Sequence, residues 1–330
     1  MKRLLILGVG ALLVASGPAS HGRAAEASAN KAPKYETSND AVAGTIKSVG
    51  SDTMNNLMAL WGESFHTLYP NVHVEVEGKG SATAPPALIQ GTATFGPMSR
   101  MMKKEEESKF ESQFGYKPTA IPTALDTLAV FVHKDNPIKG LSMKQLDAIF
   151  SKTRKRGYEK DIATWGDLGL TGKWKDKPIS LYGRNAASGT YGYLKEHALG
   201  GGDYKSTVKE QPGSSTVVQA VATDEFAIGY SGIGYLTADV RAVPLDADGG
   251  TDYVAAEADH AYDGTYPLAR YLYLYVNYKP GEKLDPLRRE FLKFVLSEQG
   301  QKDVLKDGYL PLPAKIAAKS LAKVNITAAK

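Results

Sequence analysis

The sequence predicts an α/β protein of two lobes that are joined by two chain segments. Short apolar runs typical of β-strands alternate with stretches of helical periodicity, a pattern that indicates an α/β fold with largely parallel sheets. Two apolar runs, 121–132 and 266–277, have the character of crossings between lobes, and 330 residues are enough for two domains. We therefore expect one lobe formed by residues 30–124 and 267–330, and a second lobe, residues 125–266, inserted between them.

The first 29 residues, 1–29, have the composition of a secretory signal peptide. A basic start, MKR, precedes the 12-residue apolar run LLILGVGALLVA, and small residues follow it. This run is shorter than the roughly 20 residues of a membrane-spanning helix, and the sequence has no cysteine that could carry a lipid. We expect cleavage within 24–29 and a mature protein that is soluble in the periplasm. Residues 30–42 are polar and are predicted to form a flexible lead-in.

The elements that follow are assigned from hydrophobic periodicity. Four apolar runs are predicted strands: Val72–Val76, Ala129–His133, Ile179–Tyr182 and Phe226–Tyr230. Two helical faces are expected, one with Leu57, Leu60, Trp61, Ser64 and Leu68, and a shorter one with Leu141, Leu146, Ile149 and Phe150. Near the end, Asp285 is expected to cap a helix that has Pro286 in its first turn and Leu305 on its apolar side.

The composition excludes several kinds of chemistry. Without cysteine the chain has no disulfide framework, thiolate zinc site, iron–sulfur cluster or cysteine nucleophile. It also lacks the nucleophile elbow, the Walker loop and the zinc-protease motif. The net charge of +4 is too small to indicate nucleic-acid binding, and the basic run 152–160 is predicted to be a solvated loop. We therefore expect a binding protein that is no enzyme, has no metal or cofactor and binds no nucleic acid.

Three predicted helices begin with glycine and hydroxyl residues. Their starts read GSDT at 50–53, GKGSAT at 78–83 and RNAASGT at 184–190. Glycine lets a ligand approach the backbone, and the free N–H groups and positive dipole end of a helix start attract an anion. Arg184 adds a guanidinium that can hold an oxyanion through two parallel hydrogen bonds. Together the three starts predict a site for a small multivalent oxyanion in the cleft between the lobes.

Six segments of the chain stand out, in sequence order: GSDTMNNLMALW, GKGSATAP, ATFGPMSR, IFSKTRKRGYEKDIATWGDLG, GRNAASGTYGYL and FAIGYSGIGYL. Their order resembles that of periplasmic phosphate-binding proteins, the substrate-binding components of phosphate ABC transporters. The chain resembles this family over residues 45–313, and the most specific shared pattern is R-x-x-x-S-G-T. The resemblance implies the type II periplasmic binding-protein fold, with two hinge crossings and phosphate held without metal in the cleft between the lobes. It also implies delivery of phosphate to an inner-membrane ABC permease, and we expect the protein to be monomeric.

The resemblance also implies which residues hold the ligand. The inserted lobe is expected to contribute Arg184, Ser188, Gly189 and Thr190. The other lobe is expected to contribute Ser51, Asp52, Thr53, Ser81 and Ser99. Part of the contribution of 51–53 is expected to come from backbone N–H groups.

One position departs from the family pattern. Many members have, at the position of Ser99, an aspartate that accepts the proton of hydrogen phosphate, an acceptor that disfavours fully ionised anions such as sulfate. Two carboxylates could take its place, Asp52 at the first helix start or Asp126 in the first crossing. We hypothesise that Asp52 accepts the proton of hydrogen phosphate. The alternative is that Asp52 only caps the helix start, with its side chain turned away from the ligand. Arg100 is expected to pair with a carboxylate and shape the site.

Two other functions stay open at this point. The first is a binding protein for another oxyanion, such as sulfate, molybdate or arsenate, because Ser99 replaces the usual aspartate. The second is a secreted phosphatase, which would require a nucleophile–base pair or a metal cluster that the sequence does not show.

Overall fold

The structure, a computed structural model, describes residues 25, 28 and 31–327. Apart from Ala25 and Ser28, the predicted signal peptide, 1–29, lies outside the described residues. Among the helices that are described, none has both the length and the hydropathy needed to cross a membrane.

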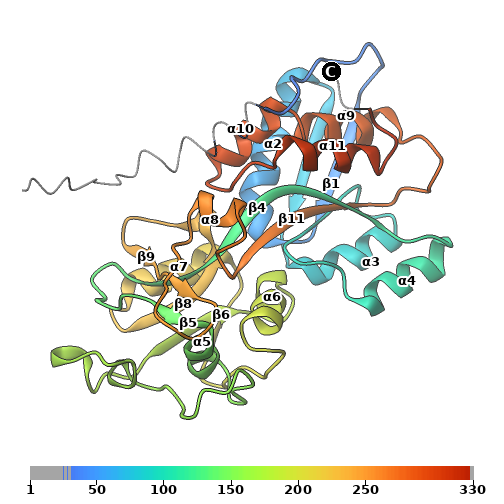
Figure 1. The fold of residues 1–330 in the computed structure, drawn as a ribbon. Helices are drawn as coiled ribbons and strands as arrows, with labels where there is room; N and C mark the ends of the chain where they lie inside the picture. The colour runs from blue at the N-terminus through green and yellow to red at the C-terminus, as the bar shows by residue number, and fades with distance from the viewer. Residues whose placement is uncertain (1–24, 26–27, 29–30, 328–330) are drawn as a thin grey trace, which may run out of the picture.

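A mixed seven-stranded sheet runs through both halves of the molecule (Figure 1). Its order is β3 (Gly96–Met98), β11 (Ala269–Val276), β4 (Thr119–His133), β8 (Ala227–Gly232), β6 (Ser180–Arg184) and β7 (Lys209–Gln211), with β9 (Val240–Ala242) paired to β4. Two smaller sheets pair β1 (Gly44–Val49) with β2 (Val72–Glu77), and β5 (Leu141–Ser142) with β10 (Leu245–Asp246). The mixed α/β architecture confirms the predicted fold class.

The prediction of largely parallel sheets is wrong around the two crossings. Strand β4 pairs antiparallel with β11, β8 and β9, and β11 pairs antiparallel with β3. The pairs β1–β2, β5–β10, β6–β7 and β6–β8 are parallel. The reason is that β4 leads the chain out of one half and β11 leads it back, so the two strands run in opposite directions where they pair.

Helices cover both halves of this sheet system. The half that contains both chain ends carries α2 (Asn55–Leu68), α3 (Ala84–Ile89), α4 (Lys104–Phe114), α9 (Pro286–Val295), α10 (Glu298–Lys306) and α11 (Ala314–Ala322). The other half carries α5 (Met143–Phe150), α6 (Gly189–His197), α7 (Ser214–Thr223) and α8 (Ala258–Tyr262). Short 3-10 turns, η1 (Asp52–Met54), η2 (Ser81–Thr83) and η5 (Ile233–Tyr235), lie where the halves meet.

The buried apolar residues form separate cores in the two halves. One set of clusters draws its members from residues 35–124 and 272–326. The other set draws them from residues 128–268. The two predicted crossings fall on β4 and β11, which we call the hinge strands. The lobe boundaries at 124/125 and 266/267 stay a prediction, and the separation of the cores supports it.

The predicted face of helix α2 is partly wrong. Leu57 and Trp61 are buried as expected, but Leu68 is exposed. Phe65 is buried in its place, with its ring 5.2 Å from that of Phe291. The buried face of α2 therefore includes Phe65, the aromatic residue that meets α9. The predicted face, which included Leu68 instead, was displaced around the helix.

The C-terminal helical region also differs from the expectation. Asp285 does cap α9 by accepting a hydrogen bond from the Arg288 N–H at 3.0 Å. The helix ends at Val295, however, and Ser297 starts α10 by accepting from the Gly300 N–H. Leu305 therefore belongs to a second helix, because Ser297 supplies a capping group in the middle of what was expected to be one helix.

The prediction of a flexible lead-in over 30–42 is wrong at Tyr35. This side chain is buried, its hydroxyl donates to Glu290 Oε2 at 3.0 Å, and its ring lies 5.6 Å from that of Phe294. The Glu298 N–H also donates to the carbonyl of Pro33 at 2.8 Å. One aromatic residue in a polar segment is enough to fix this segment on α9 and α10.

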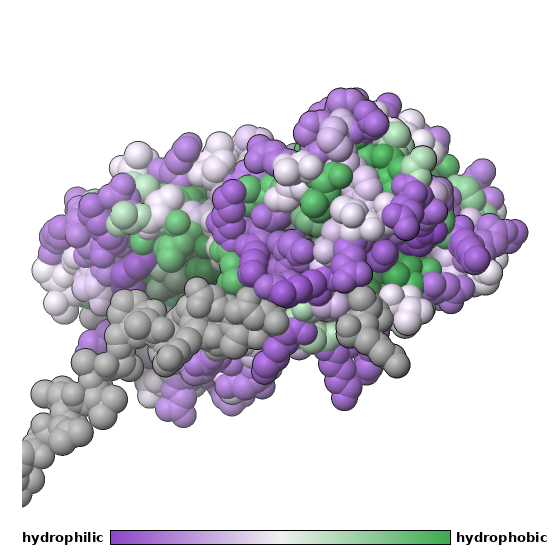
Figure 2. Space-filling model, turned by 90° about the horizontal axis from the view of Figure 1, so that it is seen from above, coloured by the Kyte–Doolittle hydropathy of each residue, from purple (hydrophilic) through white to green (hydrophobic). Residues whose placement is uncertain are grey.

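Figure 2 shows that hydrophilic residues cover most of the face seen from above, with hydrophobic residues in small separate areas. The large hydrophobic side chains that are exposed in the described part of the chain are scattered in sequence: Leu68, Val76, Met101 and Leu236. Single exposed apolar side chains of this kind are normal on a folded protein.

Replacing Asp307 by asparagine should stabilise the protein at alkaline pH. Burial raises the pKa of the Asp307 carboxyl from 3.8 to about 7. Between about pH 4 and pH 7 this carboxyl is therefore mostly ionised in the unfolded chain and still mostly protonated in the folded chain. The carboxylate therefore lowers stability as the pH rises from about 4 to about 7, and the full penalty persists above that range. We expect Asp307→Asn to raise the free energy of unfolding by at least about 1 kcal/mol at pH 8 and to have little effect near pH 4.

Urea unfolding of both proteins across this pH range measures the effect. Asp176→Asn, at an exposed carboxylate, is the control and should change the free energy of unfolding by less than about 0.5 kcal/mol. An equal stability difference for Asp307→Asn at pH 4 and pH 8 would contradict the prediction.

Candidate anion-binding site

The three predicted helix starts meet between the two halves of the molecule. The Ala82 N–H in η2 donates to the carbonyl of Ala187, just before α6, at 3.1 Å. The hydroxyls of Thr53 in η1 and Thr190 in α6 lie 3.0 Å apart. Residues more than 100 positions apart in the sequence are therefore in direct contact between the two halves, as the cleft hypothesis requires.

Three serine hydroxyls form the part of the site that belongs to the half with both chain ends. Ser51 Oγ donates to Ser99 Oγ at 3.0 Å, and the Ser99 N–H donates to Ser81 Oγ at 3.1 Å. All three residues are buried. A Cβ atom built on Gly189 would lie 2.3 Å from Ser81 Oγ and 2.5 Å from Ser99 Oγ. The start of α6 therefore lies directly against these hydroxyls, and only glycine permits this approach.

Ser188 organises the start of α6. Its Oγ accepts hydrogen bonds from the N–H groups of Thr190 and Tyr191, at 3.1 and 3.4 Å. The serine therefore acts as the N-cap of this helix, and its hydroxyl proton remains available as a donor.

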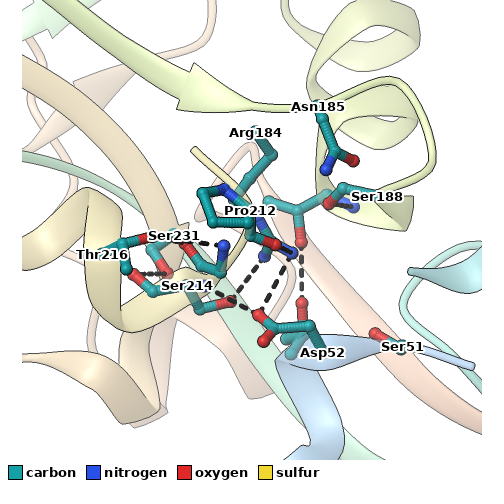
Figure 3. Close-up of polar contacts among 12 residues, drawn as sticks. Ser51, Asp52, Arg184, Asn185, Ser188, Pro212, Ser214, Thr216 and Ser231 are labelled. Atoms are coloured by element: carbon teal, nitrogen blue, oxygen red, sulfur yellow. Dashed lines mark hydrogen bonds and ion pairs between the residues drawn. The ribbon is translucent and has the colours of Figure 1, made fainter. Parts of the chain in front are cut away.

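Arg184 projects from the end of β6 towards Asp52 of the opposite half (Figure 3). Its Nη1 donates to Ser214 Oγ at 2.6 Å, its Nη2 donates to the Pro212 carbonyl at 3.1 Å, and Nη2 lies 3.1 Å from Asp52 Oδ1. Burial lowers the pKa of this guanidinium, and the Asp52 carboxylate opposes the shift. The Nε atom is buried and has no hydrogen-bond partner among the described residues. A further acceptor is therefore needed to satisfy the Nε–H of this guanidinium.

The two candidate carboxylates differ in their free oxygen atoms. Asp52 Oδ1 accepts from the Ser214 N–H at 2.7 Å, and in the described part of the chain Oδ2 has no hydrogen-bond donor. Asp126 is fully buried, its Oδ1 accepts from the Ile233 N–H at 3.0 Å, and its Oδ2 accepts from Arg270 Nε at 2.9 Å. Burial raises the pKa of the Asp126 carboxyl, and Arg270 opposes that rise. Of the two, Asp52 is the carboxylate that retains an acceptor oxygen for a ligand.

The sequence analysis missed Arg270 and Ser214. Arg270 is the register partner of Asp126 between the hinge strands, and each is the one charged residue in a crossing that is otherwise apolar or tyrosine-rich. Pairing these lone opposite charges could have identified the contact. Ser214 begins α7 after Gly213, which is a fourth glycine–hydroxyl helix start of the kind that was used for the other three.

Arg100 pairs with a carboxylate, as expected. Its Nη2 lies 2.7 Å from Glu106 Oε1. Its Cδ atom would lie 3.2 Å from a Cβ built on Gly192 of α6, so its stem packs across the boundary between the halves. Arg100 therefore borders the site and is neutralised by its own neighbour.

Comparison with known proteins identifies relatives that match most of the chain. A family model described as a PBP superfamily domain matches residues 36–299. The phosphate-binding protein PstS of Pseudomonas aeruginosa PAO1 is 56% identical over 294 residues, which cover 89% of this chain and 91% of that protein. The phosphate-binding protein PstS of Staphylococcus haemolyticus is 30% identical over 277 residues, with 82% of each chain covered.

Solved structures show the same fold. A Clostridium perfringens protein, assigned as a phosphate ABC transporter substrate-binding protein and solved with bound phosphate, superposes with a TM-score of 0.69 at 26% identity. The match covers 82% of this chain and all of that one. An ABC-type phosphate transport receptor from Vibrio cholerae superposes with a TM-score of 0.61 at 24% identity, over 81% of this chain and all of that one.

Proposed function

This chain belongs to the PBP superfamily and, within it, to the phosphate-binding proteins of the PstS type, and we propose that it captures inorganic phosphate between its lobes and delivers it to an ABC transporter. The relatives are named for binding phosphate, and the proposed role is likewise that of a binding protein and not of an enzyme. We further propose that it acts in the periplasm as a monomer and that its partner is the permease in the inner membrane.

The observation that carries the proposal is the buried Arg184 guanidinium: its Nε has no partner among the residues described, and its other nitrogens contact the Ser214 hydroxyl of one half and the Asp52 carboxylate of the other. A phosphate oxygen supplies the missing acceptor, and its other oxygens accept from hydroxyls and from free N–H groups at the helix starts. Micromolar affinity corresponds to about 8 kcal/mol. Several hydrogen bonds to a charged ligand, each about 1.5–3 kcal/mol, suffice for this after association and closure.

We propose that nine residues form the phosphate site. They are Ser51, Asp52, Thr53, Ser81, Ser99, Arg184, Ser188, Gly189 and Thr190. The hydroxyls and the N–H groups donate to phosphate oxygens, Arg184 supplies the positive charge, and Asp52 Oδ2 accepts the phosphate proton. The closeness of these groups across the two halves supports this assignment.

Calorimetric titration of the purified wild-type protein with phosphate, arsenate, sulfate and molybdate tests the function. We expect micromolar or tighter binding of phosphate, weaker binding of sulfate and molybdate, and no hydrolysis of a chromogenic phosphate ester with or without divalent metal ions. Tighter binding of sulfate than of phosphate would identify a different oxyanion carrier. Ester hydrolysis would identify a phosphatase.

Asp52→Asn should reduce the preference for phosphate over sulfate. The carboxylate accepts the proton of hydrogen phosphate and repels sulfate, which has no proton to donate, whereas an asparagine amide can donate to either anion. We expect the ratio of sulfate to phosphate dissociation constants to fall by at least about tenfold, which corresponds to about 1.4 kcal/mol. Competition calorimetry of the two anions measures this ratio.

Glu77→Gln is the matched control for that variant, because Glu77 is an exposed carboxylate at the end of β2, which precedes the second helix start. It should leave the ratio unchanged. If Asp52→Asn also leaves the ratio unchanged, Asp52 is only a partner of Arg184 and Ser214.

A further inference from the structure

Arg270 contacts both halves of the proposed site from the hinge. It lies on hinge strand β11, where its Nη1 donates to the Ser99 carbonyl at 2.9 Å and its Nη2 donates to Thr190 Oγ1 at 2.9 Å. Ser99 follows β3 in the half with both chain ends, and Thr190 lies in α6 of the other half. One guanidinium therefore joins the hinge to a site residue of each lobe.

The other hinge strand, β4, holds the Arg270 guanidinium in place through Asp126. Asp126 is the register partner of Arg270, and its Oδ2 lies 2.9 Å from Nε and 2.8 Å from Nη2. Both side chains are nearly inaccessible to solvent, at 0% and 2% exposure. The ring of Tyr193 lies 5.3 Å from Cζ and covers one side of the guanidinium. Asp126 thus fixes the position of the charged group, and the groups contributed by the lobes, Tyr193 included, can move relative to it.

We propose that Arg270 is a positioning residue that stabilises the closed form of the protein, an inference that rests on the proposed function of the site. Its bonds to Ser99 and Thr190 can exist together only while the two lobes are both close to the hinge pair. Separation of the lobes breaks at least one of them, so they stabilise the closed form and not the open form. A ligand that binds the closed form gains affinity from every contact that favours closure.

Arg270 also orients a hydroxyl of the site. Because the Thr190 oxygen accepts from Nη2, its own proton points elsewhere, either to Thr53 Oγ1 at 3.0 Å or to the bound anion. A hydroxyl that accepts from a charged donor becomes a better donor itself. Arg270 therefore strengthens the contact of Thr190 with a bound anion.

The charges of Arg270 and Asp126 predict which rate constant changes when the Arg270 contacts are lost. Asp126 neutralises Arg270, so the pair adds little to the long-range attraction that governs the association of an anion. Contacts that form on closure instead govern how long the ligand stays bound. Loss of the Arg270 contacts should therefore appear in the dissociation rate.

Arg270→Lys tests this inference with the cation retained next to Asp126. Lysine has one nitrogen in place of three, so it cannot contact Asp126, Ser99 and Thr190 as the guanidinium does. We expect the Kd for inorganic phosphate to rise about tenfold or more, with most of the change in the dissociation rate measured by stopped flow. The double variant Asp126→Asn with Arg270→Gln removes both charges, should show the same change, and carries the test if Arg270→Lys does not fold.

Arg289→Lys is the control, because Arg289 is ion-paired with Glu290 in helix α9, away from the site. It should leave the Kd and the dissociation rate at the wild-type values. A folded Arg270→Lys protein with both constants unchanged overturns the inference while the proposed function stands. A wild-type protein that does not bind phosphate overturns the proposed function and, with it, this inference.

Discussion

Arg184→Ala is expected to weaken phosphate binding at least about thirtyfold, which corresponds to about 2 kcal/mol. The guanidinium is buried at 1% exposure, and it is the positive group that faces Asp52 across the two halves. Its removal leaves the Asp52 carboxylate without its counter-charge beside the anion, so an attraction is lost and a repulsion is uncovered. The effect should therefore exceed that of deleting a single neutral hydrogen bond.

Calorimetry with phosphate at neutral pH measures this loss, and thermal unfolding of the unliganded variant shows whether it folds. Lys79→Ala is the matched control, because Lys79 is another cation near a helix start, but 72% of its side chain is exposed and it pairs with Glu77. We expect that change to alter affinity less than about threefold. Near-wild-type affinity of folded Arg184→Ala would remove Arg184 from the site.

Gly189→Ala is expected to weaken phosphate binding about tenfold to a hundredfold by preventing full closure of the lobes. The added Cβ would lie 2.3 Å from Ser81 Oγ, 2.5 Å from Ser99 Oγ and 3.0 Å from Ser81 Cβ, all in the opposite half. Relief requires either displacement of two hydroxyls of the site or separation of the halves. Overpacking of this kind costs about 1–3 kcal/mol. Because the clash exists only when the halves meet, the stability of the unliganded, open protein should change little.

Gly192→Ala is the control within the same helix. Its Cβ would meet only the flexible side chain of Arg100, at 3.2 Å from Cδ, which can shift by a few tenths of an ångström. Calorimetry should give nearly wild-type affinity for this variant, and small-angle scattering should show it closing on phosphate as wild type does. If Gly189→Ala also closes and binds normally, closure does not require a glycine where α6 meets the serines, and the prediction is wrong.

The local features of the fold were the predictable ones. The helix starts at Ser51, Gly80 and Ser188 were recognisable because an N-terminal start requires particular residues within a few positions. The same holds for Asp285 and Pro286 at the start of α9. The convergence of the starts in one site followed from the two crossings together with the family resemblance.

The features that escaped prediction depend on pairing over long distances. The Arg270–Asp126 contact joins strands 144 residues apart, and no local pattern specifies their register. The buried face of α2 is decided by Phe291 and Phe294, which approach Phe65 from the other end of the chain. Parallel and antiparallel pairing likewise depends on the path of the chain between strands, which periodicity does not report.

The arrangement of the two cores also has a consequence for the order in which they can form. One core uses only residues 128–268, a continuous stretch, whereas the other joins residues 35–124 to residues 272–326. The ribosome synthesises the chain from its N-terminus. Residues 35–124 of the divided core are therefore made before α9 and α10, with which they pack in the folded protein. Until these helices are made, Tyr35, Trp61 and Phe65 lack their partners on α9 and α10. A chain that lacks its last ~60 residues therefore leaves these aromatic side chains without the contacts that bury them in the complete fold.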